Sequence, residues 1–143
     1  MPYLKISLKA PKPLRGAYPK SLKTLGNHIR KKRIDLKLSQ KAVSKIIGVQ
    51  EETIWTWESN LFSPNLRCIP KIIDFLGYIP KNAPIFKSIK NRITLYRTLR
   101  GITQRELAKE VGVNESTIIK WEKGKGWPTI EMKTRLKDFF DEL

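Results

Sequence analysis

Cysteine, histidine and acidic residues are scarce in this chain, and each shortage limits the kinds of site that the protein can form. The single cysteine, Cys68, excludes an intramolecular disulfide and favours a reducing cytoplasm. It lies in an apolar run, so we expect a buried core side chain rather than a reactive thiol. The single histidine, His28, has no second His or Cys at a metal-ligand spacing. The sequence therefore predicts neither a metal site nor a cofactor.

Long apolar runs and catalytic constellations are missing too. No stretch approaches the roughly 18 apolar residues that cross a bilayer. Prolines and lysines interrupt the apolar stretches near the N-terminus, where a secretory signal needs a continuous one. The sequence offers no paired acids, no nucleophile–base set and no phosphate-cradling loop. We therefore expect a cytoplasmic protein with no membrane contact and no enzymatic activity.

Basic residues are what the chain has in excess, with 29 Lys and Arg against 13 Asp and Glu and a net charge of +16. This surplus suits a polyanionic partner, namely DNA, RNA or an acidic membrane surface, although basicity also serves solubility. Residues 1–24 carry six Lys and Arg and no acid. Residues 1–20 also hold four prolines, so we interpret them as an extended basic arm. A disordered tail is the plainer interpretation of this arm, and a minor-groove binder is the alternative.

An internal repeat at an offset of 64 residues organises the rest of the chain. At least twelve identities keep this register without a gap, which predicts one ancestral domain in two copies. We define the first repeat as residues 21–76, the second repeat as residues 88–143, and the linker between them as residues 77–87. The linker contains several apolar side chains, so we expect it to pack rather than to swing free. The identities pair Ile29, Arg33, Gln40, Gly48, Val49, Glu51, Thr53, Ile54, Trp57, Glu58, Pro64 and Phe75 with the residues 64 positions later.

One stretch in each repeat has the pattern of two helices that meet at a steep angle. In the second repeat it runs from Gln104 to Glu122. The small Ala108 lets the helices approach, Gly112 permits positive φ in the turn, and Ile118 locks one helix onto the other. The first repeat has Ser44, Gly48 and Ile54 at these positions.

Apolar periodicity and capping residues predict four helices per repeat. In the first repeat we expect Leu22–Asp35, Gln40–Ile47, Glu51–Ser59 and Leu66–Leu76. In the second we expect Ser88–Leu99, Gln104–Val111, Glu115–Lys123 and Thr129–Glu142. Thr103 and Glu106 are spaced for a capping box before the second of these. The last helix is expected to bury Ile130, Leu136, Phe139, Phe140 and Leu143.

These stretches resemble the helix-turn-helix of the phage repressor and Cro type, also called the xenobiotic-response-element type. That family opens its second helix with a phosphate-holding Gln, and Gln40 and Gln104 stand there. It pairs an Arg of helix one with a Glu that closes the recognition helix. Arg33 with Glu58 and Arg97 with Glu122 occupy these positions, and each Glu follows a Trp. The resemblance implies an all-α fold of two tandem lambda-repressor-like, four-helix domains behind the arm. The family's usual fifth helix is expected to be lost or reduced after Leu76.

The resemblance implies double-stranded DNA as the partner, with the third helix of each repeat in the major groove. The expected base-reading residues are Gln50, Glu51, Glu52 and Thr56 in the first repeat and Asn114, Glu115, Ser116 and Lys120 in the second. The expected phosphate-binding residues are Ser39, Gln40, Lys41, Ser59, Thr103, Gln104, Arg105, Lys123 and Lys125, with Arg33 and Arg97 also near a phosphate.

Several of these side chains have a structural interpretation as well. Glu51, Glu52 and Glu115 either accept a hydrogen bond from cytosine or stabilise the helix macrodipole. Two adjacent glutamates near phosphates are unfavourable, so we expect the first repeat to bind DNA more weakly. For Trp55 we expect core packing, and contact with the DNA backbone or a thymine methyl is the alternative. Trp57 and Trp121 are expected in the core.

The sequence thus predicts a sequence-specific DNA-binding protein, a prokaryotic or phage-type transcriptional regulator with two modules in one chain. Tethering gives the second module a millimolar effective concentration, so two weak modules bind usefully together. The alternative is an antitoxin or mobile-element accessory protein in which the Glu-rich first module docks a protein. A homodimer or another protein partner remains open.

Overall fold

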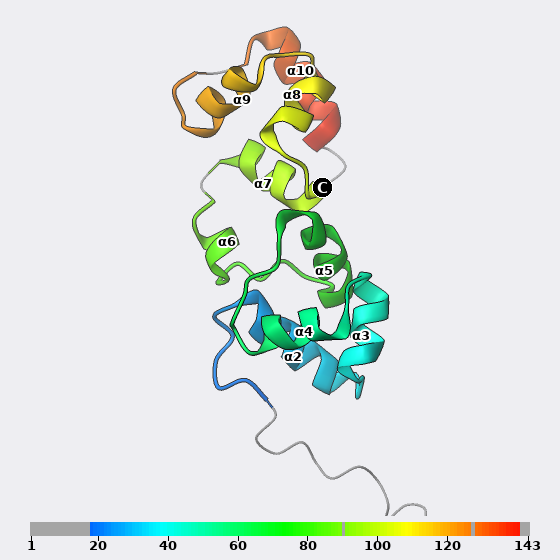
Figure 1. The fold of residues 1–143 in the computed structure, drawn as a ribbon. Helices are drawn as coiled ribbons and strands as arrows, with labels where there is room; N and C mark the ends of the chain where they lie inside the picture. The colour runs from blue at the N-terminus through cyan, green and yellow to red at the C-terminus, as the bar shows by residue number, and fades with distance from the viewer. Residues whose placement is uncertain (1–17, 90, 127, 141–143) are drawn as a thin grey trace, which may run out of the picture.

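The computed structural model describes residues 18–89, 91–126 and 128–140, without the side chains of residues 135 and 137–140. Most of the predicted arm therefore lies outside the described residues. Every regular element in the described part is helical, as the all-α prediction requires. Helices of the first repeat and helices of the second follow one another along the molecule (Figure 1). No helix in the described ranges is long and apolar enough to cross a membrane.

The first repeat begins with α2 (Leu25–Asp35), α3 (Gln40–Ile47) and α4 (Glu51–Glu58). The predicted start of α2 at Leu22 is wrong because the Thr24 hydroxyl caps the helix, accepting a hydrogen bond from the Asn27 amide at 3.1 Å. The predicted fourth helix divides into a 3₁₀ turn, η1 (Leu66–Cys68), and α5 (Ile69–Leu76). Proline stands in the first turn of α5, where its missing N–H leaves no helical bond unmade.

The second repeat follows the same order with α7 (Arg92–Arg100), α8 (Gln104–Val111), α9 (Glu115–Glu122) and α10 (Ile130–Phe140). Helix α7 starts after the Asn91 cap and not at the predicted Ser88. The predicted capping box before α8 is confirmed, with both of its hydrogen bonds present. A four-residue helix, α6 (Pro84–Lys87), precedes this set. It lies where the resemblance leads us to expect a lost or reduced helix.

Two glycines make the sharp turns between α3 and α4 and between α8 and α9. Gly48 has φ of 83° and Gly112 has φ of 79°, in the left-handed region that favours glycine. Each donates its amide hydrogen to the carbonyl oxygen of the small residue four positions earlier, Ser44 or Ala108, at 2.8 and 2.9 Å. Both turns therefore form as the sequence pattern predicts.

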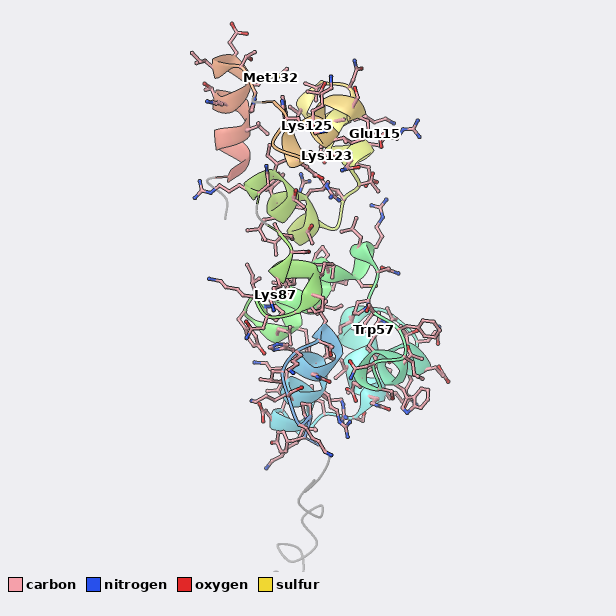
Figure 2. All side chains as sticks on the ribbon, turned by 90° about the vertical axis from the view of Figure 1, so that its left-hand side faces the viewer. Trp57, Lys87, Glu115, Lys123, Lys125 and Met132 are labelled. Atoms are coloured by element: carbon pink, nitrogen blue, oxygen red, sulfur yellow. The ribbon has the colours of Figure 1, made fainter. Side chains whose placement is uncertain are left out.

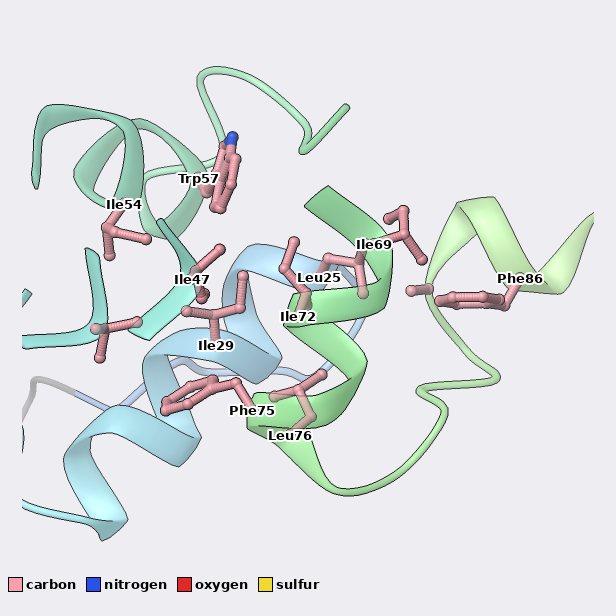
Figure 3. Close-up of a cluster of buried hydrophobic side chains, with 12 residues drawn as sticks. Leu25, Ile29, Ile47, Ile54, Trp57, Ile69, Ile72, Phe75, Leu76 and Phe86 are labelled. Carbon is pink, nitrogen blue, oxygen red and sulfur yellow. The ribbon is translucent and has the colours of Figure 1, made fainter. Parts of the chain in front are cut away.

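Isoleucines and other apolar side chains, Trp57 among them, form the core of the first repeat. Side chains from α2, α3, α4 and α5 point toward one another there (Figure 3). Ile29, Ile54 and Ile69 are fully buried, and Trp57 is 4% exposed, which confirms its predicted place. This core holds α4 against α2 and α3 and fixes which of its side chains face water.

A second core lies between α7, α8, α9 and α10. It contains Ile118 at 0% exposure, the predicted core residue Trp121 at 6%, and Leu136 at 3%. The prediction for Ile130 is wrong, because this side chain is 83% exposed at the first residue of α10. Phe139, Phe140 and Leu143 lie outside the described side chains.

The linker packs on the first core, as predicted. Ala83 and Phe86 are buried there, and Leu95 and Leu99 of α7 pack against the same cluster. The Tyr78 hydroxyl lies 2.7 Å from Nδ1 of the buried His28. Helices α5 and α7 also pack together, so the two repeats share part of their apolar interior.

Cys68 lies beside this shared region and is half-buried, less than the buried core residue that we expect. Partial burial raises the pKa of its thiol.

Candidate nucleic-acid interface

A buried hydrogen-bond network joins three helices of the second repeat. The guanidinium of Arg97 in α7 donates to both carboxylate oxygens of Glu122 in α9, at 2.7 and 3.2 Å. It also donates to the Ile102 carbonyl at 3.2 Å. The Gln104 amide donates to the same carboxylate at 2.7 Å. The start of α8, where the resemblance places a phosphate-holding Gln, is thereby fixed against the end of α9.

The first repeat contains the same network. Arg33 donates to both carboxylate oxygens of Glu58, at 2.6 and 2.9 Å, and to the Leu38 carbonyl at 3.2 Å. Gln40 donates to that carboxylate at 2.9 Å. Both predicted Arg–Glu pairs are therefore confirmed. Each Gln uses one amide hydrogen in its network, which leaves the second for a phosphate.

Helix α9 turns its predicted base-reading residues to solvent. Asn114, Glu115, Ser116 and Lys120 are all exposed, while Ile118 faces the core. Figure 2 shows Glu115, Lys123 and Lys125 on α9 and the segment that follows it. One side of α9 is thus free for a groove while the opposite side fixes the helix.

The corresponding residues of the first repeat are less uniform. Gln50, Glu51 and Glu52 are exposed at the start of α4. Thr56 is half-buried, and its hydroxyl donates to the Thr53 carbonyl at 2.8 Å. That bond occupies the hydroxyl hydrogen, so only the oxygen lone pairs of Thr56 remain for a base.

The predicted phosphate-binding residues surround the starts of α3 and α8. Ser39 and Thr103 are N-caps whose hydroxyl oxygens accept backbone amides at 3.0 and 3.1 Å. A hydroxyl that accepts in a cap keeps its hydrogen for donation. The exposed residues of this set are Ser39, Lys41, Ser59, Thr103, Arg105, Lys123 and Lys125.

A hollow of about 380 Å³ lies between the start of α8 and the end of α9. It is lined in part by Gln104, Glu122, Lys123 and Asn91. The Asn91 amide donates to the Trp121 carbonyl at 2.9 Å and so ties the start of α7 to the last turn of α9. Sequence reasoning missed Asn91, although its equivalent at the 64-residue offset, Asn27, was a visible signal.

The prediction that Trp55 packs in the core is wrong, since it is 51% exposed. It follows the inward-facing Ile54, and one residue along a helix turns the side chain by about 100°. Leu61 and Phe62, at 59% and 70% exposure, form an apolar surface that sequence reasoning also missed. A signal for it exists, because residues 46–66 contain no Lys or Arg.

Known proteins resemble this chain in its helix-turn-helix part. The sequence profile of the family described as Helix-turn-helix matches residues 93–139, within the second repeat. An uncharacterized HTH-type transcriptional regulator of Methanocaldococcus jannaschii is 42% identical over 52 residues, which are 36% of this chain and 79% of that relative. One of Archaeoglobus fulgidus is 40% identical over 53 residues, covering 37% and 76%.

A third relative is longer, and its match is local. The HTH-type transcriptional activator BcrR of Enterococcus faecalis is 41% identical over 51 residues, which are 33% of this chain and 25% of that protein. No solved structure matches the chain significantly. The profile match, the coverage of the first two relatives and the Arg–Glu–Gln network all indicate the same family. The chain belongs to the helix-turn-helix family of transcriptional regulators, with an XRE-type helix-turn-helix at residues 93–139.

Proposed function

We propose that this protein is a sequence-specific regulator of transcription, of prokaryotic or phage type, whose second repeat reads the major groove of double-stranded DNA with α9. The observation that carries this proposal is the exposed row of Asn114, Ser116 and Lys120, fixed from behind by Trp121 and the Glu122 network. An α-helix with its side chains fits the major groove, whose width is about 12 Å. The names of the relatives support regulation of transcription as the outcome.

The chemistry of α9 suits direct readout of bases. The Asn114 amide pairs with adenine, and the Lys120 ammonium with O6 and N7 of guanine. Glu115 either accepts from cytosine N4 or stabilises the positive end of α9. Ser116 donates to or accepts from several bases, so it adds contact with little discrimination.

Phosphates on either side of the groove fall to a second group of side chains. Gln104 and Thr103 lie at the start of α8, whose unpaired amides favour an anion. Lys123 and Lys125 follow α9 and are exposed. We assign them, with Arg105 and the partly covered Arg97, to contacts that fix register rather than sequence.

We further propose that the first repeat is a second helix-turn-helix domain, joined to the second by the linker. Its base-reading set is Gln50, Glu51, Glu52 and Thr56, and its phosphate set is Ser39, Gln40, Lys41, Ser59 and Arg33. Three lysines of the second repeat have uncharged equivalents in the first repeat at the 64-residue offset. Thr56 corresponds to Lys120, Ser59 to Lys123 and Leu61 to Lys125. We therefore expect the first repeat to contribute less to DNA affinity.

The test begins with selection of bound duplexes from a random pool, which reports specificity, site length and symmetry together. Lys120→Ala should cost about 1–3 kcal/mol at one selected position and relax its base preference. The double variant Lys123→Ala and Lys125→Ala should weaken binding to every sequence. It should also make the slope of log K against log salt concentration less negative, by about 0.9 for each phosphate that is no longer neutralised. Thr56→Ala, at the equivalent position of the first repeat, should cost less than Lys120→Ala. Equal binding to all sequences at all salt concentrations would overturn the proposal.

The rival function is that of an antitoxin or mobile-element accessory protein whose first repeat docks a protein. The exposed Glu51 and Glu52 beside an apolar surface favour it. Lys120→Glu and Thr56→Glu separate the two functions. If Thr56→Glu abolishes a protein partnership while DNA binding persists, and Lys120→Glu does the opposite, the two repeats divide these tasks between them.

A further inference from the structure

The solvent side of α4 is apolar and acidic, unlike that of α9. Trp55 is 51% exposed, Leu61 59% and Phe62 70%. The backbone amides of Leu61 and Phe62 both point at the Thr56 carbonyl, at 3.0 and 3.4 Å, so this loop folds back onto the end of α4 beside Trp55. The three side chains form what we name the α4 apolar face.

Two carboxylates border this face. Glu51 and Glu52 precede Trp55 by four and three residues, which places them on the same side of the helix, and both are exposed. Neither forms an ion pair within the described part of the chain. The surrounding sequence, residues 46–66, contains no Lys or Arg although the whole chain carries 29. This surface therefore lacks cations for DNA phosphates, which weakens DNA binding here, and it suits a cationic segment with apolar side chains.

The chain itself contains such a segment. Residues 1–17 carry Lys5, Lys9, Lys12 and Arg15, no acid, and the large apolar residues Tyr3, Leu4, Ile6, Leu8 and Leu14. The described chain begins at Tyr18, whose hydroxyl donates to Asp35 at the end of α2, at 2.9 Å. Helix α2 packs against α4 and is about 16 Å long. Seventeen residues span up to about 56–61 Å, so the segment is long enough to reach α4 from the end of α2.

We propose that the α4 apolar face is the docking site of the chain's own N-terminal segment, residues 1–17. The apolar side chains of that segment cover Trp55 and Phe62, and its lysines and arginine pair with Glu51 and Glu52. Tethering favours this segment over a separate partner, because its effective concentration is in the millimolar range. While it is docked, its cations are withheld from DNA phosphates.

Paramagnetic relaxation in the full-length chain tests this proposal directly. A nitroxide on Ser7→Cys, in a Cys68→Ser background, should cause loss of the Trp55 indole N–H signal and of the Leu61 and Phe62 amide signals. The equivalent residues of the second repeat, Ile119, Lys125 and Gly126, serve as the internal control and should keep their intensity. The experiment contains no DNA, so it stands or falls independently of the proposed function.

Charge reversal and isotope mixing complete the design. Glu51→Lys with Glu52→Lys should restore the weakened signals, and circular dichroism should show that the fold is intact, since both residues are exposed. Mixing isotope-labelled chains that lack nitroxide with unlabelled chains that carry it should produce no loss. The proposal is overturned if the α4 signals never weaken, if charge reversal leaves the loss unchanged, or if the loss occurs between chains in the mixture.

Discussion

Removing the negative charge of Glu122 while keeping its shape should strongly destabilise the second repeat. In Glu122→Gln, three donors still converge where the carboxylate lay: Arg97 Nε and Nη2, at 2.7 and 3.2 Å in the native chain, and the Gln104 amide, at 2.7 Å. The new amide accepts through one oxygen, so at least one of these donors faces its NH₂ group. Arg97 also becomes a largely buried cation without a counter-ion.

The magnitude follows from burial. The side chains of Arg97 and Glu122 are 14% and 9% exposed. Removal of one partner from a buried pair costs about 3–5 kcal/mol, and the residual exposure of Arg97 favours the lower end. A loss of about 3 kcal/mol is a large part of the 5–15 kcal/mol typical of a folded protein. For a chain of this size it corresponds to roughly 6–12 °C in melting temperature.

Urea unfolding followed by circular dichroism measures the change, and the chain supplies its own matched variant. Glu58→Gln removes the same carboxylate from the first repeat, where Glu58 is 3% exposed, so its cost should equal or exceed that of Glu122→Gln. Arg97→Met with Glu122→Leu removes both charges, and its stability should return to within about 1–2 kcal/mol of the native chain.

A cost below about 1 kcal/mol for both single variants would refute this reasoning. Ion pairs exposed to water contribute that little, so such a result would mean that the networks are solvated. A double variant as unstable as Glu122→Gln would refute the expectation that removal of both charges restores stability. It would show that the stability lies in the hydrogen bonds themselves rather than in charge compensation.

Three further changes test other parts of the fold. Gly26→Ala should lower the free energy of unfolding by about 3 kcal/mol or more in thermal unfolding, because its Cβ would overlap a backbone carbonyl oxygen of α4. Gly126→Ala is the control and should be nearly neutral, because the added Cβ would lie 3.7 Å from its nearest neighbour. Gly101 has positive φ, and an added Cβ would lie 2.8 Å from a carbonyl oxygen of η1. Gly101→Ala should therefore cost about 1–3 kcal/mol of stability and loosen the packing between the repeats. Faster hydrogen exchange in α5 and α7 would detect that loosening. Arg67 lowers the pKa of Glu106 to about 2, so the contribution of Glu106 is present above pH 4.5 and is lost as pH falls toward 2. In Glu106→Gln, the urea midpoint should change less between pH 4.5 and pH 2 than in the native chain. An unchanged slope would contradict the role of the Arg67–Glu106 pair.

Local signals explain why some elements follow directly from sequence. Helices α3 and α8 begin and end where the sequence predicts, at Gln40–Ile47 and Gln104–Val111. A capping hydroxyl precedes each helix and a glycine follows it, so both ends are set by neighbours in the chain. The Arg–Glu pairs are predictable for another reason, although the hydrogen bond from each Gln to the Glu was not predicted. They repeat at a fixed offset and match a known family pattern.

Tertiary packing explains what sequence reasoning missed. Trp55 is apolar and follows a core residue, yet the helix turns it outward and leaves it 51% exposed. Ile130 matches an amphipathic pattern, but it stands at the first residue of α10, beyond the reach of the second core. Leu95 and Leu99 pack on the core of the other repeat, and no periodicity within α7 distinguishes that partner from their own core.

The two repeats separate the residues that build the fold from those that face a partner. Ile54 and Ile118, Trp57 and Trp121, and the two Arg–Glu–Gln networks are the same residue types in nearly the same geometry. The solvent positions of the same helices differ, with lysines after α9 and apolar side chains after α4. Packing requirements account for the first set. A requirement for two equal DNA readers does not account for the second set, because two equal readers would both need cations beside the recognition helix. The difference is explained if the second repeat supplies most of the contact with DNA and the first also uses its equivalent scaffold to hold a cationic protein segment.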